Sequence, residues 1–373
     1  MTRRLLLLCS FVGFLLTGCV HAPPTGAVPP VKHTVEAPDG WKLALHHYPV
    51  PDGAPLRARP VILCHGLGSN HHSLDLAEGA SLARHLASQG FDVWALDLRG
   101  HGESRAAPEG KKRSKIDFDD YVRLDAPAAI EYVRSQTRSR GVAWVGHSMG
   151  GMIGFAHLGR GGEGVEALVT IASATTVKQS GLVYGVSNLS GWTAIFPAVH
   201  TRAIGRSSAA VMRGWWPFHL DNYVYNRENV TAEERRLLAG TALENLSRAE
   251  TRQFRRWVKE RTFVSKDGKD DYAANVARVE VPALLLSGSV DRIVPPSNVQ
   301  HAMVRLGSSD KTHRVIGVSE GHPWDFGHVD IVAGRRAAKV VFPIVSEWLG
   351  TRDPTACAPL PSAQPVLLEP SDS

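Results

Sequence analysis

A serine stands between two glycines in the segment Gly146-His147-Ser148-Met149-Gly150. A serine hydroxyl becomes a nucleophile once a neighbouring base takes its proton. The apolar run 142–145 before this segment is typical of a short strand, and the small residues 151–156 after it are compatible with a helix. A strand, a sharp turn and a helix would lift the serine hydroxyl clear of a sheet, and the flanking glycines leave room for the turn. We therefore interpret Ser148 as a nucleophile.

The same spacing of glycine and serine occurs a second time, at residues 317–321, and again follows an apolar stretch. His322 and Pro323 come next. Because proline disfavours a helix that begins at once, this second segment lacks the helix that the turn requires. We interpret Ser319 as a loop serine.

A serine nucleophile needs a base, and the base needs an acid that orients it. In a parallel sheet such groups come from loops at the carboxyl ends of strands, where the loops converge. Asp291 lies just past the apolar strand candidate 282–287, and His328 lies shortly after the strand candidate 314–318. We predict that Ser148, Asp291 and His328 meet at one edge of the sheet.

Other residues compete for these roles. His322 is the second candidate base, but its neighbours Pro323 and Trp324 indicate a packed loop residue. Asp330 is expected to be structural or to provide a charge at a helix N-terminus. Asp97 follows a strand candidate but precedes the serine in the chain, and we expect it to brace a loop by hydrogen bonds.

Four motifs in this order resemble α/β-hydrolases of the lipase and esterase kind, over about residues 33–350. They are Cys-His-Gly-Leu-Gly at 64–68, Asp-Leu-Arg-Gly-His-Gly-Glu-Ser at 97–104, the serine turn at 146–150, and the paired loops of Asp291 and His328. The chain order serine, aspartate, histidine is also that of α/β-hydrolases. The resemblance implies that the backbone N–H groups of Leu67 and Met149 form an oxyanion hole, and that His65 is a structural hydrogen-bonding residue.

The histidine loop, Gly-His-Val-Asp at 327–330, is similar to the loops of acid lipases and polyester synthases. The synthases carry cysteine at the apex of the turn, whereas dehalogenases and epoxide hydrolases carry aspartate there. Ser148 therefore indicates a hydrolase that acts through a serine.

The alternation of strand and helix candidates predicts an α/β fold with a mostly parallel central sheet and helices on both faces. An opening hairpin is expected over 34–48, with a turn at 38–40. We expect the α/β-hydrolase core at 33–172 and 273–350, and a disordered tail at 351–373. The alternation stops at 173–272, where we expect an inserted helical cap whose aromatic residues, such as Trp215 and Trp216, mostly form its own core.

The N-terminus begins with a basic segment, 1–4, and an apolar run, 5–16, that is too short to span a membrane as an ordinary helix. We predict a signal peptide at 1–18 and a Pro-rich tether at 19–32. Leu-Thr-Gly-Cys at 16–19 resembles a bacterial lipobox, which implies acylation of Cys19 by chains such as palmitate and a lipid anchor in the cell envelope. No acidic residue follows Cys19 directly, and in lipoproteins this favours the outer membrane. The alternative is a plain secretory signal.

The chain of 373 residues is 43% hydrophobic, enough for one large α/β domain with an insertion. Its net charge of +6 is spread out, and the densest basic run, 111–113, is expected to be a solvated surface rather than a nucleic-acid site. His46-His47 and His71-His72 are adjacent pairs and lack the spacing of a zinc-binding helix, so we expect no metal and no cofactor. Whether Cys64 and Cys357 pair stays open.

Together these features predict a serine hydrolase that cleaves small-molecule or lipid carboxylic esters through an acyl-enzyme. A thioesterase, a lactonase, an amidase or a polyester depolymerase would use the same groups. A non-catalytic lipoprotein that binds ligands in the cleft is the remaining alternative. The sequence leaves these alternatives and the oligomeric state open.

Overall fold

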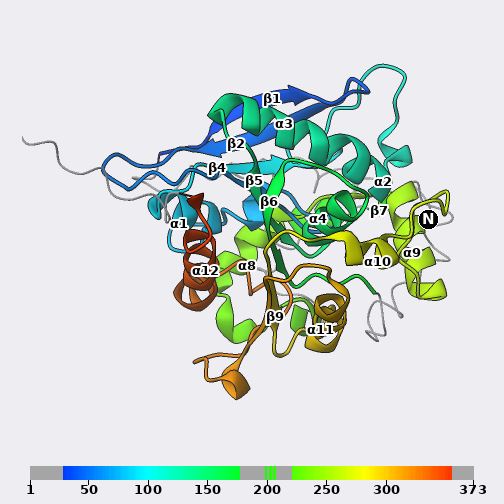
Figure 1. Ribbon diagram of the computed structural model, residues 1–373. Helices are drawn as coiled ribbons and strands as arrows, with labels where there is room; N and C mark the ends of the chain where they lie inside the picture. Colours follow the sequence, from blue (N-terminus) through cyan, green and yellow to red (C-terminus); the bar gives the residue numbers. More distant parts are fainter. Residues whose placement is uncertain (1–27, 177–197, 200, 204, 207–220, 355–373) are drawn as a thin grey trace, which may run out of the picture.

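The computed structural model describes residues 28–176, 198–199, 201–203, 205–206 and 221–354, and a twisted sheet forms its centre (Figure 1). The eight strands lie in the order β1-β2-β4-β3-β5-β6-β9-β10. Their bounds are β1 Val31–Glu36, β2 Lys42–Tyr48, β3 Val61–Cys64, β4 Val93–Asp97, β5 Val142–His147, β6 Val165–Ile171, β9 Ala283–Gly288 and β10 Lys311–Ile316. The opening hairpin pairs antiparallel, β2 is antiparallel to β4, and every further pair is parallel. This confirms the mostly parallel sheet that the sequence predicts.

The central strands are apolar along their whole length because both faces of the sheet are covered. Every residue of β3, β4, β5 and β9 is buried. Successive residues contribute alternately to two hydrophobic cores: Ile62 and Trp144 belong to one, and Leu63 and Val145 to the other. Continuous apolar runs of this kind are typical of parallel sheets between two helical layers.

Helices pack on both faces of the sheet (Figure 1). Residues of α3 Ala126–Thr137, α4 Met149–Gly159 and α11 Pro296–Arg305 lie in the first core, and residues of α1 Leu82–Ser88 and α12 Arg335–Gly350 lie in the second. Shorter helical segments are η1 His71–Ser73, η2 Arg113–Lys115, α2 Phe118–Asp120, η3 Tyr121–Asp125, η8 Val276–Arg278 and η9 Val318–Glu320. The π-helical turn η3 leads directly into α3, so residues 121–137 form one continuous helical stretch.

The described residues between β6 and β9 are mainly helical. They form α7 Asp221–Val224, η6 Arg227–Asn229, α8 Ala232–Leu237, η7 Leu238–Ala242, α9 Arg248–Glu260 and α10 Tyr272–Asn275, with a two-stranded pair of β7 Ala198–Val199 and β8 Leu246–Ser247. The helical structure is interrupted between Ala242 and Arg248, where Ser247 caps α9 and accepts a hydrogen bond from the Glu250 N–H at 3.0 Å. The boundaries 173 and 272 of the insertion stay a prediction.

Several expectations fall on parts of the chain that the structure does not describe. The signal peptide at 1–18, Cys19, Trp215, Trp216 and Cys357 lie outside the described residues, as do most of the tether and nearly all of the tail. The tether ends earlier than expected, since β1 begins at Val31. Within the described ranges, no helix combines the length and the apolar character needed to cross a bilayer.

Candidate active site

Ser148 occupies a strained turn between β5 and α4. Its backbone has φ 50° and ψ −116°, a conformation that costs a residue with a side chain about 1–3 kcal/mol. The turn is tight around it: a Cβ on Gly150 would lie 2.2 Å from the carbonyl oxygen of Cys64, and one on Gly146 would lie 2.3 Å from the backbone of Gly150. Glycine at both positions is therefore a steric requirement of the turn.

The neighbouring strand holds this turn in place. The Ser148 N–H donates to the carbonyl of Ile171, the last residue of β6, at 2.8 Å. The hydroxyl of Ser173 donates to the Ser148 carbonyl, also at 2.8 Å. Ser173 is a contributor that sequence analysis missed, because its only local signal is its position two residues beyond a strand.

The structure brings Ser148, His328 and Asp291 into a linear chain of contacts. The Ser148 Oγ lies 2.9 Å from His328 Nε2, and His328 Nδ1 lies 2.8 Å from Asp291 Oδ2. His328 and Asp291 are buried, whereas Ser148 is half-buried. With Nδ1–H donating to the carboxylate, Nε2 is left to accept the serine proton.

Asp291 is held by backbone amides as well as by the imidazole. Its Oδ1 accepts hydrogen bonds from the N–H groups of Ile293 and Val294, both at 2.8 Å. These bonds fix one carboxylate oxygen, so that the other points at His328. The loops of Ser148, Asp291 and His328 follow β5, β9 and β10, whose carboxyl ends meet at one edge of the sheet.

His147 joins the serine turn to the histidine loop, and sequence analysis missed this role. Its Nε2–H donates to the backbone carbonyl of His328 at 2.9 Å, and the two rings lie 5.1 Å apart between centroids. Burial lowers the pKa of His147 to about 3, so the ring is neutral near pH 7. The residue fills the variable position of the Gly-x-Ser-x-Gly pattern, which gave no signal for it.

The loop 65–68 lies directly beside the serine. A Cβ on Gly66 would lie 3.2 Å from the Ser148 Cβ and 3.1 Å from His147 Nδ1. His65 anchors the loop, since its Nδ1–H donates to the Gly66 carbonyl at 2.8 Å and its Nε2 accepts the Leu98 N–H at 3.2 Å. Burial lowers the pKa of His65 to about 4, which favours this neutral, bridging imidazole.

Two backbone amides near the serine are unpaired within the described part of the chain. Neither the Leu67 N–H nor the Met149 N–H donates a hydrogen bond to another described residue. Met149 is the first residue of α4, where unpaired N–H groups and the positive end of the helix dipole favour negative charge. Both amides are therefore free to bind an anionic oxygen.

A family model for the alpha/beta hydrolase fold matches residues 59–326. The chain belongs to this family. The hydrolase is 25% identical over 350 residues to a tear acid lipase-like protein of Mesocricetus auratus, covering 80% of this chain and 82% of that protein. Its fold is similar to a soluble variant of monoglyceride lipase from Saccharomyces cerevisiae, with TM-score 0.59, 18% identity and coverage of 89% and 99% of the two chains. A thermophilic esterase from Thermogutta terrifontis matches with TM-score 0.55, 18% identity and coverage of 87% and 99%. The chain is thus an alpha/beta hydrolase, and lipases and esterases are among the proteins that it resembles.

The other residues that the sequence offered for catalytic roles either lie away from Ser148 or stabilise the loops around it. Ser319 lies in the exposed η9, where its hydroxyl contacts Glu320 at 3.4 Å, and no helix follows directly. His322 is half-buried in the next loop, and its N–H donates to the Gly317 carbonyl. His328, not His322, contacts the Ser148 hydroxyl.

Asp330 connects the histidine loop of the hydrolase with the inserted segment. Its carboxylate accepts hydrogen bonds from the Gly327 N–H at 3.0 Å, the Asn226 N–H at 2.9 Å and the Asn229 side chain at 2.6 Å. Burial raises the pKa of Asp330 to about 6, although these donors act in the opposite direction. It shapes the loop and does not touch the serine.

Asp97 forms a buried cluster with two histidines, the described residues best arranged to hold a metal ion. His46 Nε2, His71 Nδ1 and an Asp97 carboxylate oxygen lie within 4.8 Å of one another. However, the two imidazole rings are stacked with centroids 3.5 Å apart. Two imidazoles that bind one zinc ion point at it with Zn–N of about 2.0–2.1 Å, which separates their centroids by about 5 Å. Here both rings instead hydrogen bond to the carboxylate at 3.0 Å, as expected of a loop brace.

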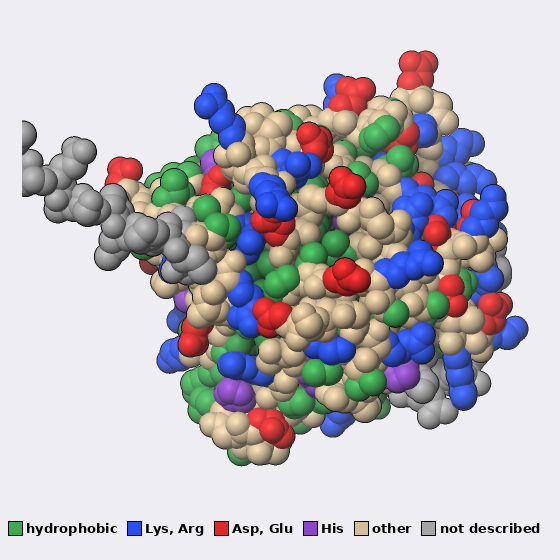
Figure 2. Space-filling view, viewed as in Figure 1, with side chains coloured by type: hydrophobic (Ala, Val, Ile, Leu, Met, Phe, Trp, Pro, Cys, Tyr) green, Lys and Arg blue, Asp and Glu red, His purple; other side chains and the backbone are tan. Residues whose placement is uncertain are grey.

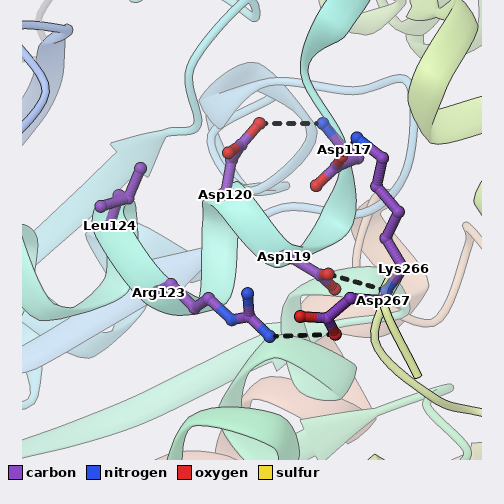
Figure 3. Close-up of a pocket in the computed structure, with 7 residues that line it drawn as sticks. All are labelled: Asp117, Asp119, Asp120, Arg123, Leu124, Lys266 and Asp267. Carbon is purple, nitrogen blue, oxygen red and sulfur yellow. Dashed lines mark hydrogen bonds and ion pairs between the residues drawn. The ribbon is translucent and has the colours of Figure 1, made fainter. Parts of the chain in front are cut away.

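A cavity of about 570 Å³ opens between α2, η3 and the loop after α9 (Figure 3). Its lining residues are Asp117, Asp119, Asp120, Arg123, Leu124, Lys266 and Asp267, and none of them belongs to the serine site. The charges are largely paired: Lys266 Nζ lies 2.8 Å from Asp117, and Arg123 lies 2.9 Å from Asp270 and 3.6 Å from Asp267. These pairs identify the cavity as a structural junction between α2 and the 265–270 loop.

Proposed function

We propose that this hydrolase cleaves carboxylic esters through a Ser-His-Asp triad and an acyl-enzyme, with Ser148 as nucleophile, His328 as general base and Asp291 as the orienting acid. The observation that carries the proposal is the chain of contacts from the Ser148 hydroxyl through His328 to Asp291, at 2.9 and 2.8 Å. Both distances lie within the range over which a proton is transferred between a nucleophile and its base.

The reaction would run in two halves. His328 takes the Ser148 proton as the oxygen attacks the ester carbonyl, and Asp291 stabilises the imidazolium that forms. The Leu67 and Met149 amides bind the oxyanion, and the loss of one such donor typically raises the barrier by about 2.7–4 kcal/mol. His328 then protonates the leaving alcohol, and a water molecule activated by the same imidazole releases the acid.

The strained serine turn supports catalysis over a binding role. A cleft that merely binds a ligand would not require a non-glycine residue at φ 50° with its hydroxyl on an imidazole. Such strain is typically found where a mechanism uses it.

The first test compares the wild type with Ser148→Ala on p-nitrophenyl esters of short and long acids. We expect the variant to lose activity by at least about a thousandfold, because the nucleophile is absent. A fluorophosphonate probe should label the wild type at Ser148 and leave the variant unlabelled. Equal turnover by the two proteins, or no label on the wild type, would contradict the proposal. Thioester, lactone and amide substrates in the same assay identify the preferred leaving group.

A lipid ester is the substrate class that we favour, and a membrane surface is the expected location. The names of the relatives, an acid lipase-like protein among them, support the substrate. The lipobox-like segment before Cys19 supports a lipid anchor in the cell envelope. Because no acidic residue follows Cys19 directly, we favour the outer membrane. Metabolic labelling with a fatty-acid probe tests the anchor: Cys19→Ser should abolish the label and release the protein from the membrane fraction.

A further inference from the structure

The helix α9 presents two faces of opposite character. Its inner face carries the fully buried Glu250 and Trp257 together with Gln253, which is 5% exposed. The Trp257 ring packs against aromatic side chains from the surrounding loops, Phe118 and Phe263. The outer face carries cations, so the helix is strongly amphipathic without exposing an apolar stripe.

Four cations form what we call the basic stripe: Arg252, Arg255, Arg256 and Lys259. At 3.6 residues per turn these positions lie within about 100° of one another around the helix. Arg252, Arg255 and Lys259 are exposed, and Arg256 has a side chain that is 40% exposed. Arg261, the residue directly after the last residue of α9, is another exposed cation.

The positive charge of the stripe is largely uncompensated. Arg256 pairs with Glu260 at 2.9 Å, whereas Arg252, Arg255 and Lys259 form no ion pair with the described residues. Residues 1–27 and 177–220, most of which the structure does not describe, contain neither aspartate nor glutamate, and the undescribed tail 355–373 contains only Glu369 and Asp372. The carboxylates that approach α9 from inside, Glu250 and Asp119, contact its opposite face.

The arrangement is unfavourable for the isolated protein. Arg252 repels Arg255 and Arg256 at spacings of three and four residues, and Lys259 repels the same two arginines. Each like-charge pair at such a spacing costs a helix about 0.2–0.5 kcal/mol. A surface helix that serves solubility alone mixes both signs. An external negative surface would convert this repulsion into attraction.

The stripe lies in the region of the chain that carries most of the net positive charge. Residues 173–272 contain 15 Lys and Arg against 10 Asp and Glu, which accounts for nearly all of the net charge of +6. Figure 2 shows Lys and Arg side chains gathered along the edge of the molecule where Figure 1 places α9. Two cations near the stripe have partners: Lys266 pairs with Asp117, and Arg123 with Asp270.

We propose that the basic stripe of α9 is a docking surface for an anionic lipid bilayer. From Arg252 to Lys259 the stripe forms a straight array about 10 Å long on one face of the helix. The aromatic side chains of α9 face inward, so it would bind a bilayer by electrostatic attraction, without inserting apolar groups. For the same reason it offers no aromatic surface on which the bases of a single-stranded nucleic acid could stack. Each basic residue near an anionic bilayer contributes about fivefold to binding. The proposal does not depend on the proposed esterase activity.

The test measures binding of the full chain to phosphatidylcholine vesicles with and without phosphatidylglycerol. The apolar N-terminal segment contributes to both vesicle types, so the readout is the ratio of the two affinities. The test variant is Arg252→Gln, Arg255→Gln and Lys259→Gln together, since glutamine preserves helix propensity. The matched control is Lys42→Gln, Arg278→Gln and Lys339→Gln, three exposed residues of the hydrolase core without a described ion pair.

We expect the wild type to prefer anionic vesicles and to lose this preference at high salt. The test variant should lose the preference by roughly a hundredfold, and the control should keep it. Circular dichroism and turnover of a soluble short-chain ester should be the same for all three proteins.

Equal binding of both vesicle types by the wild type, or equal loss in test variant and control, would overturn the proposal. So would tight RNA or DNA binding through the stripe without a preference for anionic vesicles. A wild type without esterase activity would contradict the proposed function and leave the vesicle result to stand alone.

Discussion

A single buried imidazole links the serine turn to the histidine loop. The His147 Nε2–H donates to the backbone carbonyl of His328, and this bond helps to position the His328 ring against the Ser148 hydroxyl. Because burial lowers its pKa to about 3, His147 stays neutral over the pH range in which an esterase works. We describe it as a positioning residue, since it touches neither the serine oxygen nor the site of the ester.

We predict that His147→Phe lowers kcat by between about ten- and a hundredfold while KM changes little, because a displaced base no longer meets the serine proton. The ring volume is retained, but the His328 carbonyl is left without its donor. His147→Gln, whose amide can donate to the same carbonyl, should recover part of kcat. Steady-state kinetics on one ester check both variants. A phenylalanine variant with wild-type kcat would show that the bond has no positioning role.

Local rules explain the elements that carry the serine site, but not the helix that carries the basic stripe. The serine turn is readable because Gly146 and Gly150 are steric requirements of one short segment. The break before α9 is harder to predict, since it depends on Ser247 and Glu250 capping a helix whose inner face is buried against Phe118 and Phe263. In the sequence, charged residues with helical propensity lie on both sides of that break, so the sequence alone does not indicate where one helix ends and the next begins.

The cap of α9 contains a buried carboxyl group that makes the stability of the fold depend on pH. Glu250 accepts hydrogen bonds from the Ser247 N–H at 3.2 Å and the Tyr121 hydroxyl at 3.1 Å, and burial raises its pKa to about 7. A carboxyl whose pKa is raised by folding stabilises the protein fully below its unfolded pKa of about 4.3. That contribution is lost as the pH rises through about 7.

We therefore predict that Glu250→Gln reduces the loss of stability between pH 5 and pH 8. The glutamine oxygen can accept the Ser247 N–H while its amide donates to Tyr121, so the cap is preserved without a buried charge. The difference between the two pH values should shrink by up to ~3 kcal/mol, from 1.36 kcal/mol per pKa unit. Urea unfolding of both proteins at the two pH values measures it. An identical pH dependence would place the titration elsewhere.

At the scale of the whole molecule, the sequence predicts what short segments determine and misses what distant segments build together. Ser148, Asp291 and His328 each follow a recognisable strand, and the structure places their side chains in contact. The bond from His147 to His328 spans 181 residues, and no local pattern encodes it. The stacking of His46, in β2, on His71, in η1, likewise depends on two distant segments meeting at Asp97.

The inserted segment is bonded to both loops that flank the serine. The Glu244 N–H donates to the Gly68 carbonyl at 2.8 Å, next to the loop of Leu67. On the other side, Asn229 donates to Asp330 at 2.6 Å and to the Asp325 carbonyl at 2.7 Å. The geometry of the serine site therefore depends on the folding of the insertion, and the two should unfold together in one transition.

We predict that Asn229→Ala uncouples the insertion from the serine site. Asn229 is 3% exposed, and its removal takes one donor from the buried Asp330 carboxylate and one from the Asp325 carbonyl, although Asn226 still donates to both, at a cost of about 1–3 kcal/mol. In the wild type, loss of ester hydrolysis and loss of the circular dichroism signal should coincide along a urea titration. In the variant, activity should disappear at a lower urea concentration than the helical signal.

The control is Asn275→Ala, since the Asn275 side chain makes no hydrogen bond with the described residues, and its two curves should coincide. Coincident curves for Asn229→Ala as well would mean that the insertion and the histidine loop are coupled through other contacts, and that this asparagine merely fills space.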